Sequence, residues 1–391
     1  MARRRVRTWA AAVATGVLVV VVAAAASAAA VVVEEKLMVE MALVPGAAST
    51  GAVCLDGSPP AYHLHQGSGA RGWLLQFEGG GWCNDARSCA GRARTSLGSR
   101  SLMNKLETFS GLLSNDPAMN PDFYNWNRVK MRYCDGGSFA GDSEFKNGSS
   151  VMYMRDQRIW DAIITDLFLK GLAKAEKVLL SGCSAGGLAT FFHCDDLEKR
   201  LRGVATGRIS GHGTVRSFFN GVVDFQGVQK NLNKNCSDST VKSYQCFFPQ
   251  YVLRSIRAPY FILNSAYSVY QFFQNFVPPS SDPRGQWSRC KAALSGCSSS
   301  QIATLQGLRS AMLMALKPFE GESKVGMFIN SCFSHCQSES QDTWFAPNSP
   351  RLHDKTIAKL VGDWFFERGA AQEVDCPYPC DSTCHNIIPF S

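Results

Sequence analysis

The sequence lacks the patterns that mark several common classes of protein. No C-x-x-C motif pairs with a second C-x-x-C or with H-x-x-x-H, which argues against a zinc framework. No Pro/Ser-rich linker, internal repeat or block of like charge divides the 391 residues, so we expect one domain over residues 31–391. Lys and Arg number 40 against 32 Asp and Glu, and this weak excess identifies no anionic partner. We expect no nucleic-acid partner and a monomer.

Residues 1–30 have the pattern of a targeting segment. Four arginines before residue 8 precede an unbroken run of Ala, Val, Leu and Gly, and Ala26-Ser27-Ala28 supplies small side chains for cleavage. The apolar run continues through Val33, a length that also fits an uncleaved signal anchor. We favour a cleaved signal peptide, with a membrane as partner only if the segment stays attached. Both alternatives deliver the rest of the chain to the secretory lumen.

Cysteine usage also points to an oxidising compartment. Fifteen cysteines are unusual for a reducing compartment and expected in a secreted protein. The odd count leaves at least one thiol unpaired, and two close spacings predict short disulfide loops, Cys83/Cys89 and Cys290/Cys297. N-glycosylation sequons occur at Asn147 and Asn235, although a disulfide at Cys236 would disfavour the second. We therefore expect a secreted, extracellular glycoprotein.

Short apolar runs alternating with a helical pattern predict an α/β fold. Apolar residues recur at helical spacing from Ile159 to Phe168, between two of the predicted strands. This order predicts a mostly parallel central sheet with helices on both faces and ligand chemistry at the carboxyl ends of the strands. The segment 203–213 is glycine-rich and a weak strand candidate, which leaves open that one strand is missing. The predicted strands are Trp73–Phe77, Val129–Tyr133, Lys177–Leu180, Tyr260–Leu263 and Val325–Ile329.

Residues 182–186, Gly-Cys-Ser-Ala-Gly, form a G-x-S-x-G motif between a predicted strand and a predicted helix over 185–202. In α/β-hydrolases this motif places a nucleophilic serine on a tight strand-to-helix turn, where neighbouring positions have no room for bulk. Ser184 is therefore the candidate nucleophile, and the N–H of Ala185 is a candidate oxyanion donor. The alternative is a tight turn whose serine has no catalytic role.

A triple glycine, Gly79-Gly80-Gly81, follows an early strand, where the α/β-hydrolase fold places its second oxyanion donor. Glycine lets backbone N–H groups approach a developing negative charge without a Cβ in the way. The alternative is a plain turn. A phosphate-binding loop is excluded because no Gly-Lys-Ser/Thr follows.

A histidine is required after the serine in the chain order Ser, acid, His. His335 is the best placed, because it follows the strand ending at Ile329 and lies in a loop that Cys332 and Cys336 are positioned to staple. His353 and His385 are the alternatives. His193, on the predicted nucleophile helix, is expected at the surface.

The acid of a triad is not evident. No carboxylate follows the strand Tyr260–Leu263 closely; Asp282 is the nearest downstream, and Asp224 lies upstream.

With these motifs assembled, the chain closely resembles the plant pectin acetylesterase family, relatives of the animal lipid deacylase Notum. The resemblance implies an α/β-hydrolase that removes acetyl esters from the galacturonan backbone of pectin in the plant cell wall, without a metal or organic cofactor. It assigns Ser184 as nucleophile, His335 as base, and Gly80, Gly81 and Ala185 as oxyanion donors. The matching stretches are Phe77–Asn84, Arg132–Gly141, Ser181–Ala189, Gly227–Asn231, Cys246–Gln250, Phe328–Trp344 and Asp375–Asn386.

Two departures from the family pattern affect the expected activity. The family's triad aspartate falls in a segment like Asn-Ala-Ala-Tyr-Asp, and Ser268 occupies that position here. The family also has a strand-forming segment with a cysteine where this chain has residues 203–213, and that loss would explain the odd cysteine count. A catalytically impaired wall or polysaccharide-binding homologue is therefore the alternative function, and a deacylase of lipidated protein is a third.

Aromatic candidates for sugar stacking, or for the core, are Trp82, Trp126, Trp344 and Tyr267.

Overall fold

The computed structural model describes residues 36–68, 71–201, 205–210, 216–238, 242–278 and 281–384. The residues in these ranges form one compact unit. The predicted signal peptide or anchor and His385 lie outside the described residues. Within the ranges above, no helix combines the length and apolar character needed to cross a bilayer.

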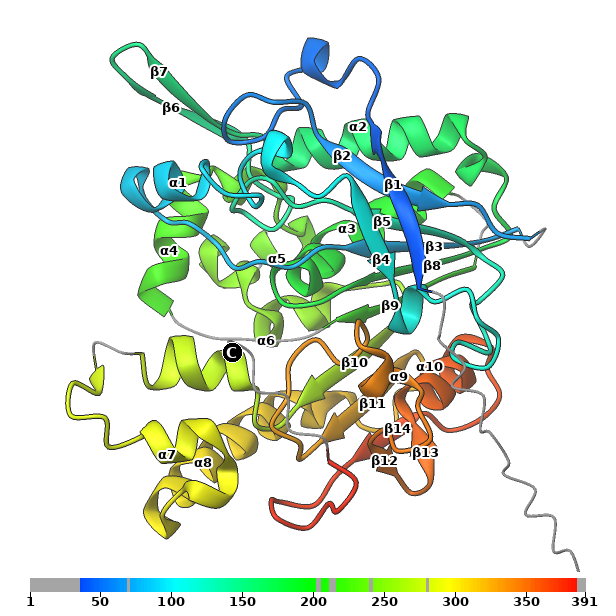
Figure 1. The fold of residues 1–391 in the computed structure, drawn as a ribbon, viewed down its shortest axis with the longest axis vertical. Helices are drawn as coiled ribbons and strands as arrows, with labels where there is room; N and C mark the ends of the chain where they lie inside the picture. The colour runs from blue at the N-terminus through cyan, green and yellow to red at the C-terminus, as the bar shows by residue number, and fades with distance from the viewer. Residues whose placement is uncertain are drawn as a thin grey trace, which may run out of the picture. The chain divides into compact units, whose positions relative to one another are not determined.

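The central feature is a sheet of ten strands among the described residues, in the order β14-β11-β10-β9-β8-β3-β5-β2-β1-β4 (Figure 1). Neighbours from β14 to β5 run parallel, and β2, β1 and β4 extend the sheet with antiparallel pairs. The strands are β1 (Leu37–Leu43), β2 (Ala61–His65), β3 (Gly72–Phe77), β4 (Leu106–Phe109), β5 (Asn127–Met131), β8 (Lys177–Gly182), β9 (Ala205–Ser210), β10 (Tyr260–Ser265), β11 (Val325–Asn330) and β14 (Gln372–Val374). The mostly parallel sheet predicted from the sequence is confirmed.

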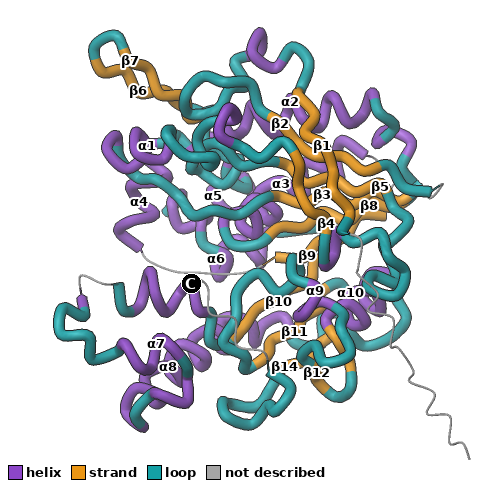
Figure 2. Tube along the Cα trace, in the orientation of Figure 1, coloured by secondary structure: helices purple, strands orange, loops and turns teal. Residues whose placement is uncertain are grey.

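Helices cover both faces of this sheet (Figure 2). Alternate strand residues point to opposite faces, so Leu75 and Leu180 join one apolar cluster with α2 and α3, whereas Leu74 and Leu179 join another with α10. This arrangement explains why the central strands read as unbroken apolar runs in the sequence. The helices are α1 (Ala86–Arg92), α2 (Asp156–Leu169), α3 (Ala185–Leu201), α4 (Arg216–Phe225), α5 (Lys234–Ser237), α6 (Pro249–Val252), α7 (Ser288–Ala292), α8 (Ser299–Leu316), α9 (Gln341–Trp344) and α10 (Ile357–Phe365).

In the part of the chain that the structure describes, two short hairpins stand outside the central sheet. One pairs β6 (Ser143–Asn147) with β7 (Ser150–Met154), and the other pairs β12 (Arg351–Leu352) with β13 (Lys355–Thr356). The β6–β7 hairpin projects away from the other elements in Figure 1 and carries the sequon residue Asn147, which is exposed at its tip.

The structure corrects the expectation that a strand is missing near the glycine-rich segment 203–213. Residues Ala205–Ser210 form strand β9, which pairs in parallel with β8 and β10, so this sheet does not lack the strand that the sequence left in doubt. The backbone of any residue except proline supplies the donor and acceptor that a parallel ladder needs. Strand β9 lies between β8 and β10 and can therefore form through backbone pairing, without the run of apolar side chains on which the sequence prediction relied.

Seven disulfides link fourteen of the cysteines, and Cys194 on α3 is the free, buried thiol. Both short loops predicted from spacing are confirmed. Cys332 and Cys336 are both paired, although not with each other. The other five bridges are Cys54–Cys134, Cys183–Cys336, Cys236–Cys246, Cys332–Cys384 and Cys376–Cys380.

Candidate active site

Ser184 lies on the sharp turn between β8 and α3. Its φ of 57° is in the left-handed region, and the residue is buried, with a relative exposure of 8%. A Cβ on Gly182 would overlap the carbonyl oxygen of Gly186, and one on Gly186 would overlap that of Phe77. The two flanking glycines are therefore required by close backbone packing, as in the nucleophile turn of an α/β-hydrolase.

The triple-glycine segment meets this turn. Strands β3 and β8 run parallel with Phe77 opposite Gly182, so residues that follow each strand emerge side by side. A Cβ on Gly79 would lie 2.7 Å from the carbonyl oxygen of Cys183 and 3.2 Å from the Cβ of Ser184. Helix α3 begins at Ala185, and the first N–H groups of a helix have no partner within it. The structure thus brings the Ser184 turn, the glycine segment and a helix N-terminus together.

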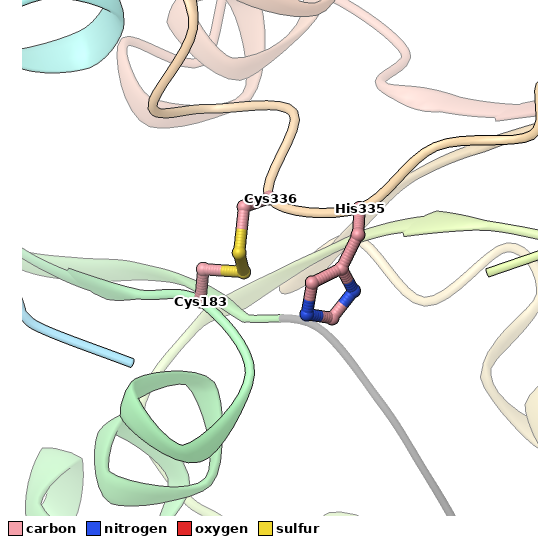
Figure 3. A group of neighbouring side chains, drawn as sticks. All are labelled: Cys183, His335 and Cys336. Carbon is pink, nitrogen blue, oxygen red and sulfur yellow. A yellow bond between two sulfur atoms is a disulfide. The ribbon is translucent and has the colours of Figure 1, made fainter. Parts of the chain in front are cut away.

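His335 is brought to the same place by a disulfide. Its loop follows β11, and the Cys183–Cys336 bridge joins the residue before Ser184 to the residue after His335 (Figure 3). An imidazole nitrogen of His335 lies within 4.8 Å of both sulfur atoms. Because the two sulfurs are bonded to each other, they offer no thiolate to a metal ion. The bridge ties together the two loops that carry the candidate nucleophile and base.

Ser268 lies beside the imidazole of His335. Its Oγ lies 3.3 Å from Nδ1 of His335, where a triad carboxylate would accept a hydrogen bond. The loops after β10 and β11 are held in register by backbone hydrogen bonds, 2.8 Å from Ala266 N to Asn330 O and 3.3 Å from Val269 N to Ser334 O. Position 268 therefore lies where the acid of a triad would be expected, and a neutral hydroxyl occupies it.

The two other acids considered from the sequence have different partners. The carboxylate of Asp282 accepts hydrogen bonds from the backbone N–H groups of Gln286 and Trp287, at 2.8 and 3.0 Å. Asp224 is exposed on α4 and accepts a hydrogen bond from Gln229 at 3.0 Å. Both carboxylates are engaged locally, and neither is bonded to His335 in the described residues.

Burial governs the protonation of His335. Desolvation lowers the pKa of this imidazole to about 4. A neighbouring carboxylate would oppose that shift by stabilising the imidazolium, and a serine hydroxyl does not. The ring of Tyr270 stacks on the imidazole, with the ring centroids 5.1 Å apart and an angle of 17° between the planes. His335 is therefore neutral at physiological pH, and it is half-buried against the ring of Tyr270.

The other described histidine candidates lie elsewhere. His353 is exposed in the β12–β13 turn and bonded to Glu373 at 2.6 Å. The expectation that His193 lies at the surface was wrong: it is buried, contacts the carbonyl oxygen of Phe139 through Nε2 at 2.7 Å, and stacks on Trp160. The loop containing Phe139 covers this part of α3, which helical position alone does not reveal.

Most of the aromatic candidates for sugar stacking are core residues. Trp126, Trp344 and Tyr267 are buried, and packing against other side chains accounts for them. Trp82 is half-buried directly after the glycine segment, and its indole N–H donates a hydrogen bond to Ser138 Oγ at 2.7 Å. Among the four, Trp82 is the one that is not fully buried.

Two parts of this site were not inferred from the sequence. Tyr270 was not singled out, because an aromatic residue in an apolar stretch is typical of a core. The Cys183–Cys336 pairing was not inferred because connectivity cannot be read from sequence. The sequence does contain a signal for this pairing, because Cys183 directly precedes Ser184 and Cys336 directly follows His335.

Comparisons with known proteins agree with this geometry. The family model described as Pectinacetylesterase matches residues 32–385. Pectin acetylesterase 5 of Arabidopsis thaliana is 44% identical over 90% of this chain and 86% of its own length, and pectin acetylesterase 7 of the same plant is 41% identical over 89% and 93%. The solved structure of the Wnt deacylase Notum from Drosophila matches with a TM-score of 0.75 at 19% identity, over 89% of this chain and all of that one, which shows the α/β-hydrolase-like fold. The chain belongs to the pectin acetylesterase family.

Proposed function

We propose that this protein is a carboxylic ester hydrolase that removes acetyl groups from the galacturonan backbone of pectin, with Ser184 as nucleophile and His335 as general base. Membership of the pectin acetylesterase family supports the reaction and the polysaccharide substrate. The observation that carries the mechanism is the disulfide that joins the Ser184 turn to the His335 loop. An elbow serine and a histidine tied to its turn are the parts that acyl transfer needs.

In the first step, Ser184 Oγ attacks the acetyl carbonyl carbon while His335 accepts the hydroxyl proton. The carbonyl oxygen becomes an oxyanion, which the backbone N–H groups of Gly80, Gly81 and Ala185 stabilise. As the intermediate collapses, His335 returns the proton to the departing sugar oxygen, leaving an acetyl ester on Ser184. Water, deprotonated by the same histidine, then attacks this ester and releases acetate.

The hydroxyl at position 268 reduces the expected rate. A triad carboxylate orients the imidazole and stabilises the imidazolium that forms in the transition state. Ser268 carries no charge, and a base whose pKa is near 4 has a small driving force for proton abstraction at neutral pH. We therefore infer an active esterase that turns over more slowly than a complete triad would.

Acetate release from acetylated pectin by the purified secreted protein tests this function. We expect acetate above the level obtained with Ser184→Ala, and less acetate from acetylated xylan, whose backbone lacks galacturonic acid. Equal release by the wild-type protein and Ser184→Ala would refute the assignment of Ser184. Saturable pectin binding without any acetate release would instead support the impaired binding homologue.

The pH profile of the reaction follows from the buried base. Only neutral His335 accepts the serine proton, so activity is lost as the pH falls through the pKa of this residue. Because burial lowers that pKa to about 4, kcat/KM should stay nearly constant from neutral pH to about pH 5 and fall with a midpoint near 4. A midpoint near 6.5, the ordinary value for histidine, would contradict the buried environment described above.

Secretion to the cell wall predicts a modification at the hairpin tip. Residues 1–30 are proposed to direct the chain to the secretory lumen, where exposed Asn147 meets the glycosylation machinery. We expect one glycan there, so Asn147→Gln should abolish the mass shift on glycosidase treatment. Asn235→Gln is the matched control and should leave the mass shift unchanged. Cys236, in the sequon of Asn235, is buried in a disulfide with Cys246. A cytosolic protein with thiols that alkylate without prior reduction would contradict this localisation.

A further inference from the structure

The imidazole of His335 has to be held in one orientation without a carboxylate. Its hydrogen-bond partner at Nδ1 is the Ser268 hydroxyl at 3.3 Å, beyond the usual range for such bonds. A hydroxyl can both donate and accept, so it does not select one tautomer as a carboxylate does. The hydrogen bond at Nδ1 is therefore a weak restraint on the ring, and other contacts must fix its plane.

Tyr270 supplies a contact of the required kind. Its ring lies nearly parallel to the imidazole, at 17° and 5.1 Å between centroids, so it restrains the plane rather than one atom. The loop that carries it is tied to the His335 loop, because Val269 N donates to Ser334 O. Within the loop itself, Phe272 N donates to Ser268 O. Tyr270 then leads into the π-helix Gln271–Phe276, a form of helix that often occurs at functional sites.

The phenol of Tyr270 also reaches the glycine segment. A Cβ on Gly81 would lie 3.2 Å from its hydroxyl oxygen, so the side chain spans from the candidate base to a candidate oxyanion donor. Burial raises the pKa of Tyr270, and the hydroxyl therefore stays protonated and uncharged at neutral pH. The same side chain limits the space available to both loops.

We propose that Tyr270 is a positioning residue that holds the His335 imidazole in its catalytic orientation by ring stacking, in the role that a triad carboxylate has elsewhere. This inference rests on the proposed function, because it treats His335 as the general base. It predicts that the flat ring is the essential feature and that the hydroxyl is dispensable for orienting the imidazole.

Nuclear magnetic resonance of His335 tests the stacking without requiring turnover. In a Ser184→Ala background, ¹⁵N spectra report the pKa of the imidazole and whether the ring occupies one orientation. We expect Tyr270→Phe to retain one sharp set of His335 resonances and the low pKa of the parent. Tyr270→Ala should broaden or double these resonances, because the ring plane is no longer fixed, and shift the pKa from about 4 toward the ordinary 6.5. Unchanged resonances and an unchanged pKa in Tyr270→Ala would overturn the inference.

Kinetics with an acetyl ester separate the effect of ring stacking on kcat from the effect of burial. Tyr270→Leu keeps an apolar cover over His335 but removes the flat ring, so we expect kcat to fall about tenfold or more with KM nearly unchanged. Tyr270→Phe should keep the wild-type kcat, and thermal unfolding of each variant checks that it folds. Full kcat in Tyr270→Leu, or an equal loss in Tyr270→Phe, would overturn the role of the ring. A wild-type protein that releases no acetate would refute the proposed function, and the NMR comparison would still decide whether Tyr270 orients His335.

Discussion

Replacing Ser268 with aspartate is expected to raise kcat on an acetyl ester by about 10²-fold or more while changing KM little. Ser268 Oγ already lies 3.3 Å from Nδ1 of His335, so a carboxylate at this position would accept a hydrogen bond from the imidazole. Its charge would stabilise the imidazolium of the transition state and raise the pKa of His335 above about 4. Initial rates at neutral pH, followed by a full pH profile, measure both effects.

The pH profile and two control variants make this prediction specific. The acidic limb of Ser268→Asp should move to higher pH, so the gain at neutral pH should exceed the gain at pH 4. Ser268→Asn has nearly the shape of aspartate without its charge and should give no comparable gain. Asp282→Asn should leave the wild-type rate unchanged. The Asp282 carboxylate accepts hydrogen bonds from the backbone N–H groups of Gln286 and Trp287 and, among the described residues, makes none with His335. A rate controlled by Asp282 and insensitive to Ser268→Asp would mean that the acid position has been misassigned.

Removing the Cys183–Cys336 bridge with paired alanine substitutions is expected to reduce both stability and activity. The bridge joins residues 153 positions apart and therefore restricts the unfolded chain strongly, so the free energy of unfolding should fall by about 3–5 kcal/mol. It also fixes the His335 loop against the Ser184 turn, and a displacement of about 1 Å between reacting groups can cost about 10²-fold in rate. We expect kcat to fall by at least that factor in protein that remains folded.

The Cys290–Cys297 bridge provides the matched control. It joins Cys290 on α7 to Cys297, only 7 positions away, so its loss should cost less stability and leave kcat of the folded protein unchanged. Denaturant unfolding and acetyl ester kinetics on both double variants make the comparison. Equal kcat values in the two variants would show that the Cys183–Cys336 bridge contributes stability alone.

The nucleophile turn was predictable from sequence because its causes are local. A strand pattern, glycines at 182 and 186 and a helix pattern occur within some twenty-five residues, and the steric need for both glycines acts within the turn itself. Ser268 was identified through the family resemblance, and the structure places it beside Nδ1 of His335.

Features that depend on contacts between distant segments of the chain could not be predicted from the sequence. Strand β9 forms between β8 and β10 through backbone pairing, which leaves no periodic signal in a glycine-rich segment. The burial of His193 depends on a loop more than fifty residues earlier in the chain. Tyr270 contacts His335 across 65 positions, and only the fold reveals that stacking.

Trapping the acetyl-enzyme tests the central claim most directly. The purified protein is mixed with acetylated pectin, quenched in acid at short times and digested, and the peptide containing Ser184 is examined by mass spectrometry. An acetyl ester with a good leaving group, run in parallel, speeds formation of the intermediate without changing its hydrolysis, so the acetyl-enzyme should accumulate. We predict an acetyl group on Ser184 that appears before steady-state acetate release and is absent when His335 is replaced by alanine. Acetate release without acetylation of Ser184, or undiminished release by Ser184→Ala, would contradict the account.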